Sequence, residues 1–254
     1  MSLPPTPLRG TIVVTIDGPA GSGKSSTARE IARRLDFRHL DSGALYRTVA
    51  LGLLRAGMEG ALEREPDSEL LSALDLALLP EEGGFRLLLD GADPGEAIRT
   101  EEVTRLAAWV AKFPAVRRRL LPLQRAAATF GGLVADGRDM GTIVFPQAPV
   151  KVFLTASLGE RARRRLLQEG RSAGEGEIAN EAGRIRDRDA SDETRAVAPL
   201  RRAPGALLLD TTELGFEEQV NRIVEAVRRV QAAAATGGSG ATPPGGAPRS
   251  GLTG

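Results

Sequence analysis

Residues 11–25 read TIVVTIDGPAGSGKS. The opening run, Thr11 to Ile16, is a short and nearly continuous apolar stretch of β-branched residues, which is typical of a strand covered on both faces. A glycine-rich turn follows at once, and after it apolar residues recur at helical spacing from Ala28 to Leu35. A strand, a glycine turn and a helix in direct succession predict the first unit of an α/β fold.

The turn Gly18-Pro-Ala-Gly-Ser-Gly-Lys-Ser25 fits G-x-x-x-x-G-K-[ST], the P-loop that holds nucleotide phosphates. Its glycines let backbone N–H groups point at a phosphate, and the following helix N-terminus adds partial positive charge. Lys24 can reach the β and γ oxygens, and Ser25 can coordinate Mg²⁺. A chance glycine-rich turn is the alternative, but the strand before it and the helix after it favour nucleotide binding. The residues predicted to contact ATP here are Gly18, Pro19, Ala20, Gly21, Ser22, Gly23, Lys24, Ser25 and Ser26.

Short apolar runs alternate with helical segments along the rest of the chain. This alternation predicts a P-loop NTPase fold of the α/β class, in which helices cover both faces of a five-stranded parallel sheet. We expect helices at Ser42 to Ala56 and at Phe216 to Ala232. The four further strands are expected at Phe37 to Leu40, Leu133 to Ala135, Val150 to Leu154 and Ala206 to Leu209.

One interval breaks this rhythm and divides the domain. Leu74 to Leu79, then PEEGG, then Phe85 to Asp90 reads as an antiparallel hairpin. It lies within about 59–99, which the α/β core does not need, so we expect an inserted subdomain there. The folded domain is expected at 11–235. Because their composition is rich in Pro or Gly, the segments outside it are predicted to be a flexible N-terminal arm at 1–10 and a disordered tail at 236–254.

Composition and charge exclude several kinds of protein. Lys and Arg total 34 against 33 for Asp and Glu, a net charge of +1, which disfavours a nucleic-acid or membrane-surface binder. The absence of cysteine excludes disulfides, thiolate metal sites and a Cys nucleophile, and with His39 as the only histidine we expect no multi-His zinc site. No signal-peptide pattern is visible, and no apolar run approaches the roughly 20 residues that span a bilayer. We expect a cytoplasmic monomer.

Arginines follow several of the predicted strands. Arg47 comes shortly after the second strand, Arg138 and Asp139 follow the third, and Arg188 and Arg195 lie in a polar segment before the last. A guanidinium binds phosphate through two hydrogen bonds and keeps its charge. For any single arginine a solvated surface role is the alternative. Their positions after strands predict a second anion site that faces the P-loop and takes a phosphate-bearing substrate.

Four motifs together resemble the bacterial cytidylate kinase family. They are the P-loop, Leu40-Asp-Ser-Gly-Ala-Leu-Tyr-Arg47, Ala135-Asp-Gly-Arg-Asp-Met-Gly-Thr142 and Arg195-Ala-Val-Ala-Pro-Leu200. They occur in the family's order and at similar spacing, over about Thr11 to Val230. The resemblance implies a P-loop kinase that transfers the γ-phosphoryl group of ATP to CMP or dCMP with Mg²⁺. It also implies a monophosphate-binding region enlarged by the insert, and a mobile lid at about 157–190.

The resemblance assigns the acceptor nucleotide to one group of residues. Ser42, Arg117 and Asp139 match positions that recognise the cytosine edge, where a carboxylate can accept from the exocyclic amino group and uracil offers a carbonyl instead. Asp192 matches a contact to the sugar. The arginines match contacts to the CMP phosphate or to the nucleotide. The residues expected to bind CMP are Ser42, Arg47, Arg117, Arg138, Asp139, Arg188, Asp192 and Arg195.

A second group of residues is expected to supply positive charge for catalysis and to hold the metal. Lys24, Arg138 and Arg188 would stabilise the phosphoryl group in flight. Ser25 would coordinate Mg²⁺, and Asp136 would orient it through water. Asp41 or Ser42 could instead be only the N-cap of the next helix, and Asp136 a carboxylate that only stabilises its loop. The residues expected to contact ATP from the lid are Arg161 and Arg165, which share one helix face.

Two other functions remain open on the sequence alone. A P-loop kinase could act on another small acceptor, such as a different monophosphate or shikimate. A nucleotide-dependent switch or binding module could instead recruit a partner through the tail at 236–254. The GTPase signature N-K-x-D is absent from the sequence, which disfavours the switch.

Overall fold

A computed structural model describes residues 11–58 and 65–237 of the chain. The arm predicted at 1–10, the segment 59–64 of the predicted insert and residues 238–254 of the predicted tail lie outside the described residues. In the part of the chain that is described, no helix is both long enough and apolar enough to cross a membrane.

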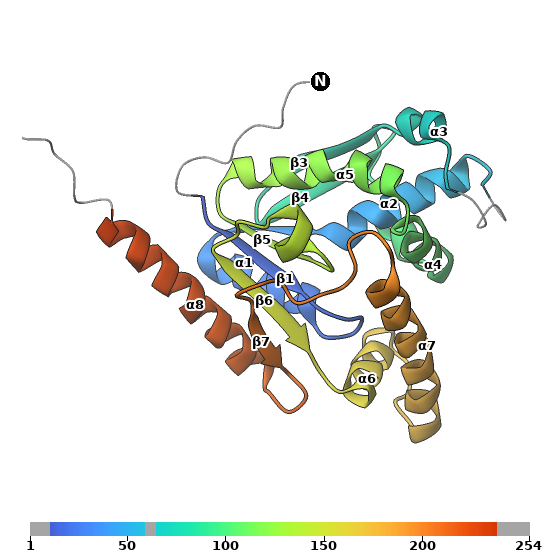
Figure 1. Ribbon diagram of the computed structural model, residues 1–254. Coiled ribbons are helices and arrows are strands. Elements are labelled where there is room, and N and C mark those ends of the chain that lie inside the picture. The colour runs from blue at the N-terminus through green and yellow to red at the C-terminus, as the bar shows by residue number, and fades with distance from the viewer. Residues whose placement is uncertain (1–10, 59–64, 238–254) are drawn as a thin grey trace, which may run out of the picture.

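All five predicted strands form one parallel sheet, in the order β2-β5-β1-β6-β7 (Figure 1). β1 lies at the centre and every one of its residues is buried, as its β-branched composition predicts. The sheet confirms the predicted α/β class. The strands are β1 (Val13–Asp17), β2 (Arg38–Asp41), β5 (Leu133–Gly137), β6 (Val150–Thr155) and β7 (Leu207–Asp210).

Helices cover both faces of this sheet, as predicted. On one face α1 and α8 pack against each other over a core that includes Ile16, Ile31 and Ile223 (Figure 1). On the other face α2, α4 and α5 enclose a larger core that includes Leu40 and Leu120. The helices of the two layers are α1 (Lys24–Leu35), α2 (Ser42–Arg55), α4 (Glu101–Val110), α5 (Pro114–Ala126) and α8 (Phe216–Gly237).

The predicted hairpin is confirmed, with β3 (Leu76–Glu81) and β4 (Gly84–Leu89) antiparallel in their own two-stranded sheet. Its turn is tied to the main sheet, because the His39 N–H donates to the Gly83 carbonyl oxygen at 3.0 Å. The insert therefore stands beside β2, the edge strand that leads to Ser42. The short helices around it are α3 (Ser68–Ala73) and the turns Gly95–Arg99 and Ala127–Phe130.

The region predicted as a lid consists of two helices, α6 (Leu158–Gln168) and α7 (Glu175–Thr194). The sequence indicated a polar segment where α7 lies, and the structure forms a helix of 20 residues there. Its buried positions carry Glu181, Ile185, Asp189 and Asp192. Three of these four residues are carboxylates. The buried face of α7 therefore lacks the apolar residues at helical spacing by which a helix is recognised in a sequence.

The sheet topology gathers the predicted motifs at one edge. Because β2, β5 and β1 are parallel neighbours, their carboxyl ends meet, and ligands of open α/β sheets bind at such a point. The register aligns Asp17 with Gly137 and Asp41 with Asp136. The P-loop, the start of α2 and the turn that bears Arg138 therefore begin side by side.

Candidate active site

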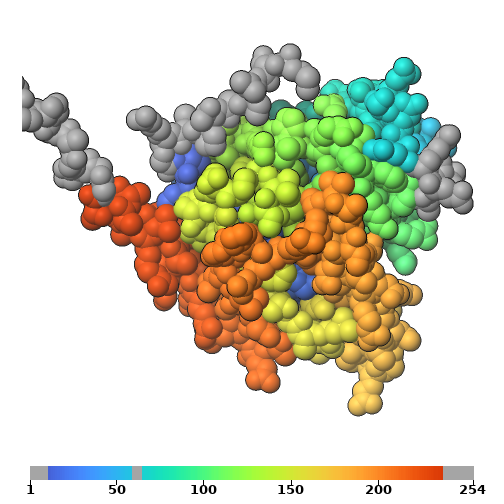
Figure 2. Space-filling view, in the orientation of Figure 1, coloured from blue at the N-terminus to red at the C-terminus, as the bar shows by residue number. Residues whose placement is uncertain are grey.

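A cleft of about 500 Å³ opens where these strands end, between the P-loop, the start of α2 and helix α7. In Figure 2 part of the blue N-terminal region is visible in a hollow bordered by the yellow and orange α6–α7 region. The predicted site residues that line the cleft are Ala20, Gly21, Lys24, Ser25, Ser26, Ser42, Arg47, Arg117, Asp136, Arg138, Asp139, Arg165, Arg188, Asp192 and Arg195. The predicted residues outside its lining are Gly18, Pro19, Ser22, Gly23 and Arg161.

The P-loop is folded tightly enough that glycine is required. A Cβ on Gly18 would lie 2.0 Å from the Leu154 carbonyl oxygen of β6, so no other residue fits at this corner. Lys24 opens α1, and its Nζ donates to the Pro19 carbonyl oxygen at 2.6 Å. Burial pulls the pKa of Lys24 well below its usual value, and the nearby Arg138 charge lowers it further. An anion in the cleft would relieve both effects.

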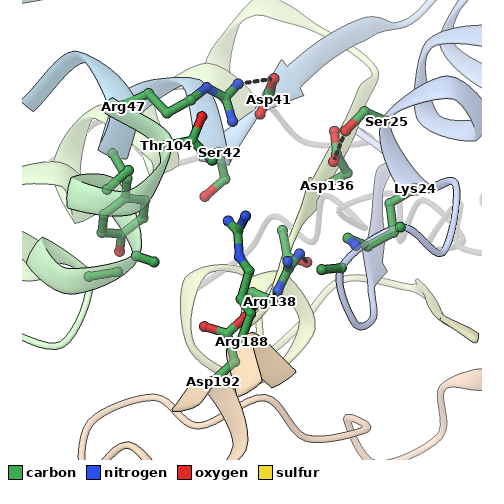
Figure 3. Close-up of a pocket in the computed structure, with 18 of the residues that line it drawn as sticks. Lys24, Ser25, Asp41, Ser42, Arg47, Thr104, Asp136, Arg138, Arg188 and Asp192 are labelled. Atoms are coloured by element: carbon green, nitrogen blue, oxygen red, sulfur yellow. Dashed lines mark hydrogen bonds and ion pairs between the residues drawn. The ribbon is translucent and has the colours of Figure 1, made fainter. Parts of the chain in front are cut away.

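Asp136 lies opposite the P-loop with both carboxylate oxygens engaged. Ser25 Oγ donates to Asp136 Oδ2 at 2.7 Å (Figure 3). His39 Nε2 hydrogen-bonds to Asp136 Oδ1 at 2.7 Å. Burial alone would raise the pKa of Asp136, but the His39 and Ser25 hydrogen bonds and the Lys24 charge hold it below its usual value. A charged carboxylate therefore stands beside the P-loop hydroxyl.

Arg47, Arg138 and Arg188 line the same cleft from three different segments of the chain (Figure 3). Arg138 Nε donates to Asp192 Oδ2 at 2.8 Å, which fixes the guanidinium between the P-loop and α7. Burial lowers the pKa of Arg188 to about 10, and the charge of Arg138 adds to this effect. Within the described residues, the buried Nε atoms of Arg47 and Arg188 have no hydrogen-bond partner. Clustered cations with free donors are the groups by which a protein can bind an anion.

A third group lies beside this arginine cluster, around Asp139. The Asp139 carboxylate pairs with Arg117, whose guanidinium also lies 5.6 Å from the centre of the Tyr46 ring. Ser42 Oγ accepts a hydrogen bond from Gln124 Nε2 at 2.9 Å. Ser42, Arg117 and Asp139 line the same cleft, so it offers hydroxyl and charged groups that suit the polar edge of a planar base.

The sequence left the N-cap of helix α2 open between Asp41 and Ser42, and the structure decides between them. The N-cap of α2 is Asp41, whose carboxylate accepts from the Ala44 N–H at 2.9 Å. Asp41 also accepts from Arg47 at 2.8 Å, so it orients this arginine as well. The Ser42 side chain is left to face the cleft.

Two further residues, one in the cleft lining and one that supports it, were not singled out from the sequence. Thr104, on α4, lines the cleft near Ser42 (Figure 3). Asp17, at the end of β1, accepts from the N–H groups of Met140 and Gly141 at 2.8 Å each, which fixes the short helical turn Met140–Val144 directly after Asp139. Burial raises the pKa of Asp17 to about 6. The position of Asp17 directly before the P-loop could have indicated its role. No feature of the sequence indicated Thr104.

The two lid arginines have different surroundings. Arg165 lines the cleft, and its Nε lies 2.9 Å from Glu181 Oε1. Arg161 does not line the cleft, which corrects the expected contact with ATP. Its guanidinium is buried behind the P-loop, where it pairs with Asp189. The i, i+4 spacing placed both arginines on one helix face but did not show what that face packs against.

Comparison with known proteins finds matches over most of the chain. A family model described as cytidylate kinase matches residues 14–229. The cytidylate kinase of Saccharophagus degradans is 48% identical over 216 residues, covering 84% of this chain and 96% of that protein. The cytidylate kinase of Pseudomonas putida is 49% identical over 214 residues, covering 83% of this chain and 93% of that protein. Among solved structures, TT1252 from Thermus thermophilus has a TM-score of 0.43 and 23% identity, covering 87% of this chain and 97% of that chain.

Proposed function

The chain belongs to the cytidylate kinase family, and on this premise we propose how its cleft transfers the γ-phosphoryl group of ATP to CMP or dCMP. The observation that carries the proposal is that Lys24, Arg138 and Arg188 line one cleft, in which we propose two facing anion sites, one around Lys24 and one around the two arginines. ATP would occupy the P-loop with its γ-phosphate toward the arginines. The CMP phosphate would lie among the arginines, in line with that group.

Such a transfer is catalysed mainly by positioning of the substrates and by electrostatic stabilisation, because the negative charge of the transferring group is spread over its oxygens. Lys24, Arg138 and Arg188 all line the cleft, and in this proposal they would surround the place where that charge develops. Arg138 is held by Asp192 and Arg47 by Asp41, so these two guanidiniums are oriented before substrate arrives. A phosphate acceptor needs no strong general base, which agrees with a cleft served by carboxylates and arginines.

We propose that Ser25 and Asp136 hold Mg²⁺, directly and through water. The donor set fits this ion, because Mg²⁺ prefers oxygen ligands and keeps several waters beside one or two protein groups and the substrate phosphates. Among the described residues, no cluster of three or more His, Cys, Asp or Glu is placed to hold a metal by itself. Bound Mg²⁺ would neutralise phosphate charge. Asp136 keeps its carboxylate charged and aimed at Ser25.

For the base, we propose that Asp139, Arg117 and Ser42 read the edge of cytosine. The buried Asp139 carboxylate can accept from an exocyclic amino group, and Arg117 can donate to a ring nitrogen or a carbonyl. Asp192 remains proposed as the contact to the sugar. The monomeric state and the cytoplasmic location stay predictions.

An acceptor panel tests this function. Initial rates of ADP formation would be measured with ATP and Mg²⁺ and with CMP, dCMP, UMP, AMP or shikimate in turn. We expect CMP or dCMP to be turned over at least about tenfold faster than UMP, because one base-edge contact is worth about this much. Removal of Mg²⁺ by EDTA should abolish turnover. An equal or higher rate with AMP or shikimate, or ATP hydrolysis that no acceptor stimulates, would contradict the proposal.

A further inference from the structure

Both backbone polar groups of Ala20, at the tip of the P-loop, are bonded to the lid helices. The Ala20 N–H donates to Asp189 Oδ1 of α7 at 3.0 Å. The Ala20 carbonyl oxygen accepts from Arg161 Nη1 of α6 at 3.0 Å. The same two side chains pair with each other. Helices α6 and α7 therefore both hydrogen-bond to the backbone of Ala20, although they lie some 140 to 170 residues after it in the sequence.

Close packing reinforces these contacts. Ala20, Ala162 and Ile185 form a small buried apolar cluster, separate from the two cores that flank the sheet. Gly21 has a positive φ of 73°, and a Cβ there would lie 2.9 Å from the Arg161 carbonyl oxygen. The P-loop tip thus lies directly against the backbone of α6, with no room for a side chain between them.

The proposed phosphoryl transfer has no direct use for either charge. Neither Arg161 nor Asp189 lines the cleft, and each is about nine-tenths buried. Burying an ion pair is costly unless its remaining donors and acceptors are satisfied. Here the Ala20 backbone satisfies both partners, and Arg161 Nε donates to the Ala156 carbonyl oxygen at 3.0 Å. Both partners of this buried ion pair therefore depend on the P-loop backbone for hydrogen bonds.

We propose that Arg161 and Asp189 are positioning residues that clamp the P-loop tip to the base of the lid. The clamp keeps the phosphate-binding loop in its bound shape before ATP arrives, so less ordering is needed on binding. It also fixes the start of α6 and the last turns of α7 to the P-loop. Lid movement would then be confined to the α6–α7 connection at 169–174 and the segments next to it. This inference rests on the proposed function only in taking the P-loop as the ATP site.

The test compares Asp189→Ala with Arg163→Met, a matched change on α6. Arg163 is half-exposed, pairs with Glu160 in the same helix and does not contact the P-loop. Without nucleotide, we expect amide hydrogen exchange in a peptide containing Ala20 and Gly21 to be about tenfold faster in Asp189→Ala, because hydrogen bonds to a charged group are lost. The KM for ATP should rise by about as much, while the KM for CMP changes by less than about twofold. Arg163→Met should change none of these.

Two conservative variants keep the test decisive if Asp189→Ala does not fold. Asp189→Asn retains an acceptor for the Ala20 N–H, and Arg161→Lys retains the charge, so both should give smaller rises in exchange at the same peptide. The proposal is overturned if that peptide exchanges as in the parent protein in folded variants. It is also overturned if exchange rises equally in all core peptides and both KM values move together, since that is general destabilisation. The exchange readout needs no turnover, so failure of the proposed function would leave it intact.

Discussion

Replacing Arg138 by methionine is expected to lower kcat about 10³-fold, because an arginine that stabilises the transferring phosphoryl group is worth at least this much in related reactions. Arg138 follows β5 directly and lies close enough to Lys24 and Arg188 to lower the pKa of both. Methionine keeps most of the length and removes the charge. The KM for ATP should stay within about twofold, since the P-loop and the metal residues are left in place.

Steady-state rates with ATP and CMP varied separately would measure this effect. Arg186→Met is the matched control, because Arg186 is an exposed arginine on α7, two residues before Arg188. A kcat for Arg138→Met within about tenfold of the parent would show that this guanidinium does not meet the phosphoryl group. An equal loss in Arg186→Met would attribute the effect to net charge instead.

Replacing Asp139 by asparagine is expected to reduce the preference for CMP over UMP by about 10²-fold, the upper range for one well-placed contact to a base edge. The carboxylate only accepts hydrogen bonds, which matches the amino group of cytosine and repels the carbonyl of uracil. Asparagine has nearly the same shape but carries a donor as well. The CMP rate should fall and the UMP rate should rise or stay constant.

The readout is the ratio of kcat/KM for CMP to that for UMP, which a loss of folded protein does not change. Because the Asp139→Asn change would leave the Arg117 charge without its partner, the double variant Arg117→Met/Asp139→Asn separates base reading from an uncompensated charge. Asp187→Asn, at an exposed position of α7, is the control. An unchanged ratio in Asp139→Asn would rule out this residue as the reader of the base.

The sheet and the P-loop were predictable because local signals agreed. β1 is a β-branched run next to a glycine turn, and the hairpin of β3 and β4 is marked by its own glycines. Parallel strands bring their carboxyl ends together whatever lies between them, so the meeting of Lys24, Asp136 and Arg138 followed from topology. These features need only short stretches of sequence and one general rule.

What the sequence did not predict depends on partners far along the chain. Helix α7 can bury carboxylates because they form ion pairs with Arg138, Arg161 and Arg165. The spacing of hydrophobic residues in the sequence does not reveal such pairs. The sequence likewise does not show that Arg161 pairs with Asp189, so Arg161 was expected to contact ATP in the cleft. The last helix extends past its expected end at Ala232, because the alanines that follow favour helix until Gly237.

Binding of a bisubstrate compound, in which adenosine and cytidine are joined through an oligophosphate chain, tests the facing anion sites most directly. With Mg²⁺ in calorimetry, we expect one molecule per chain and binding more than about tenfold tighter than that of ATP, because the second half binds without a second loss of translational freedom. Arg138→Met should remove most of this advantage. Binding no tighter than that of ATP, or unaffected by Arg138→Met, would mean that the two sites do not face one another.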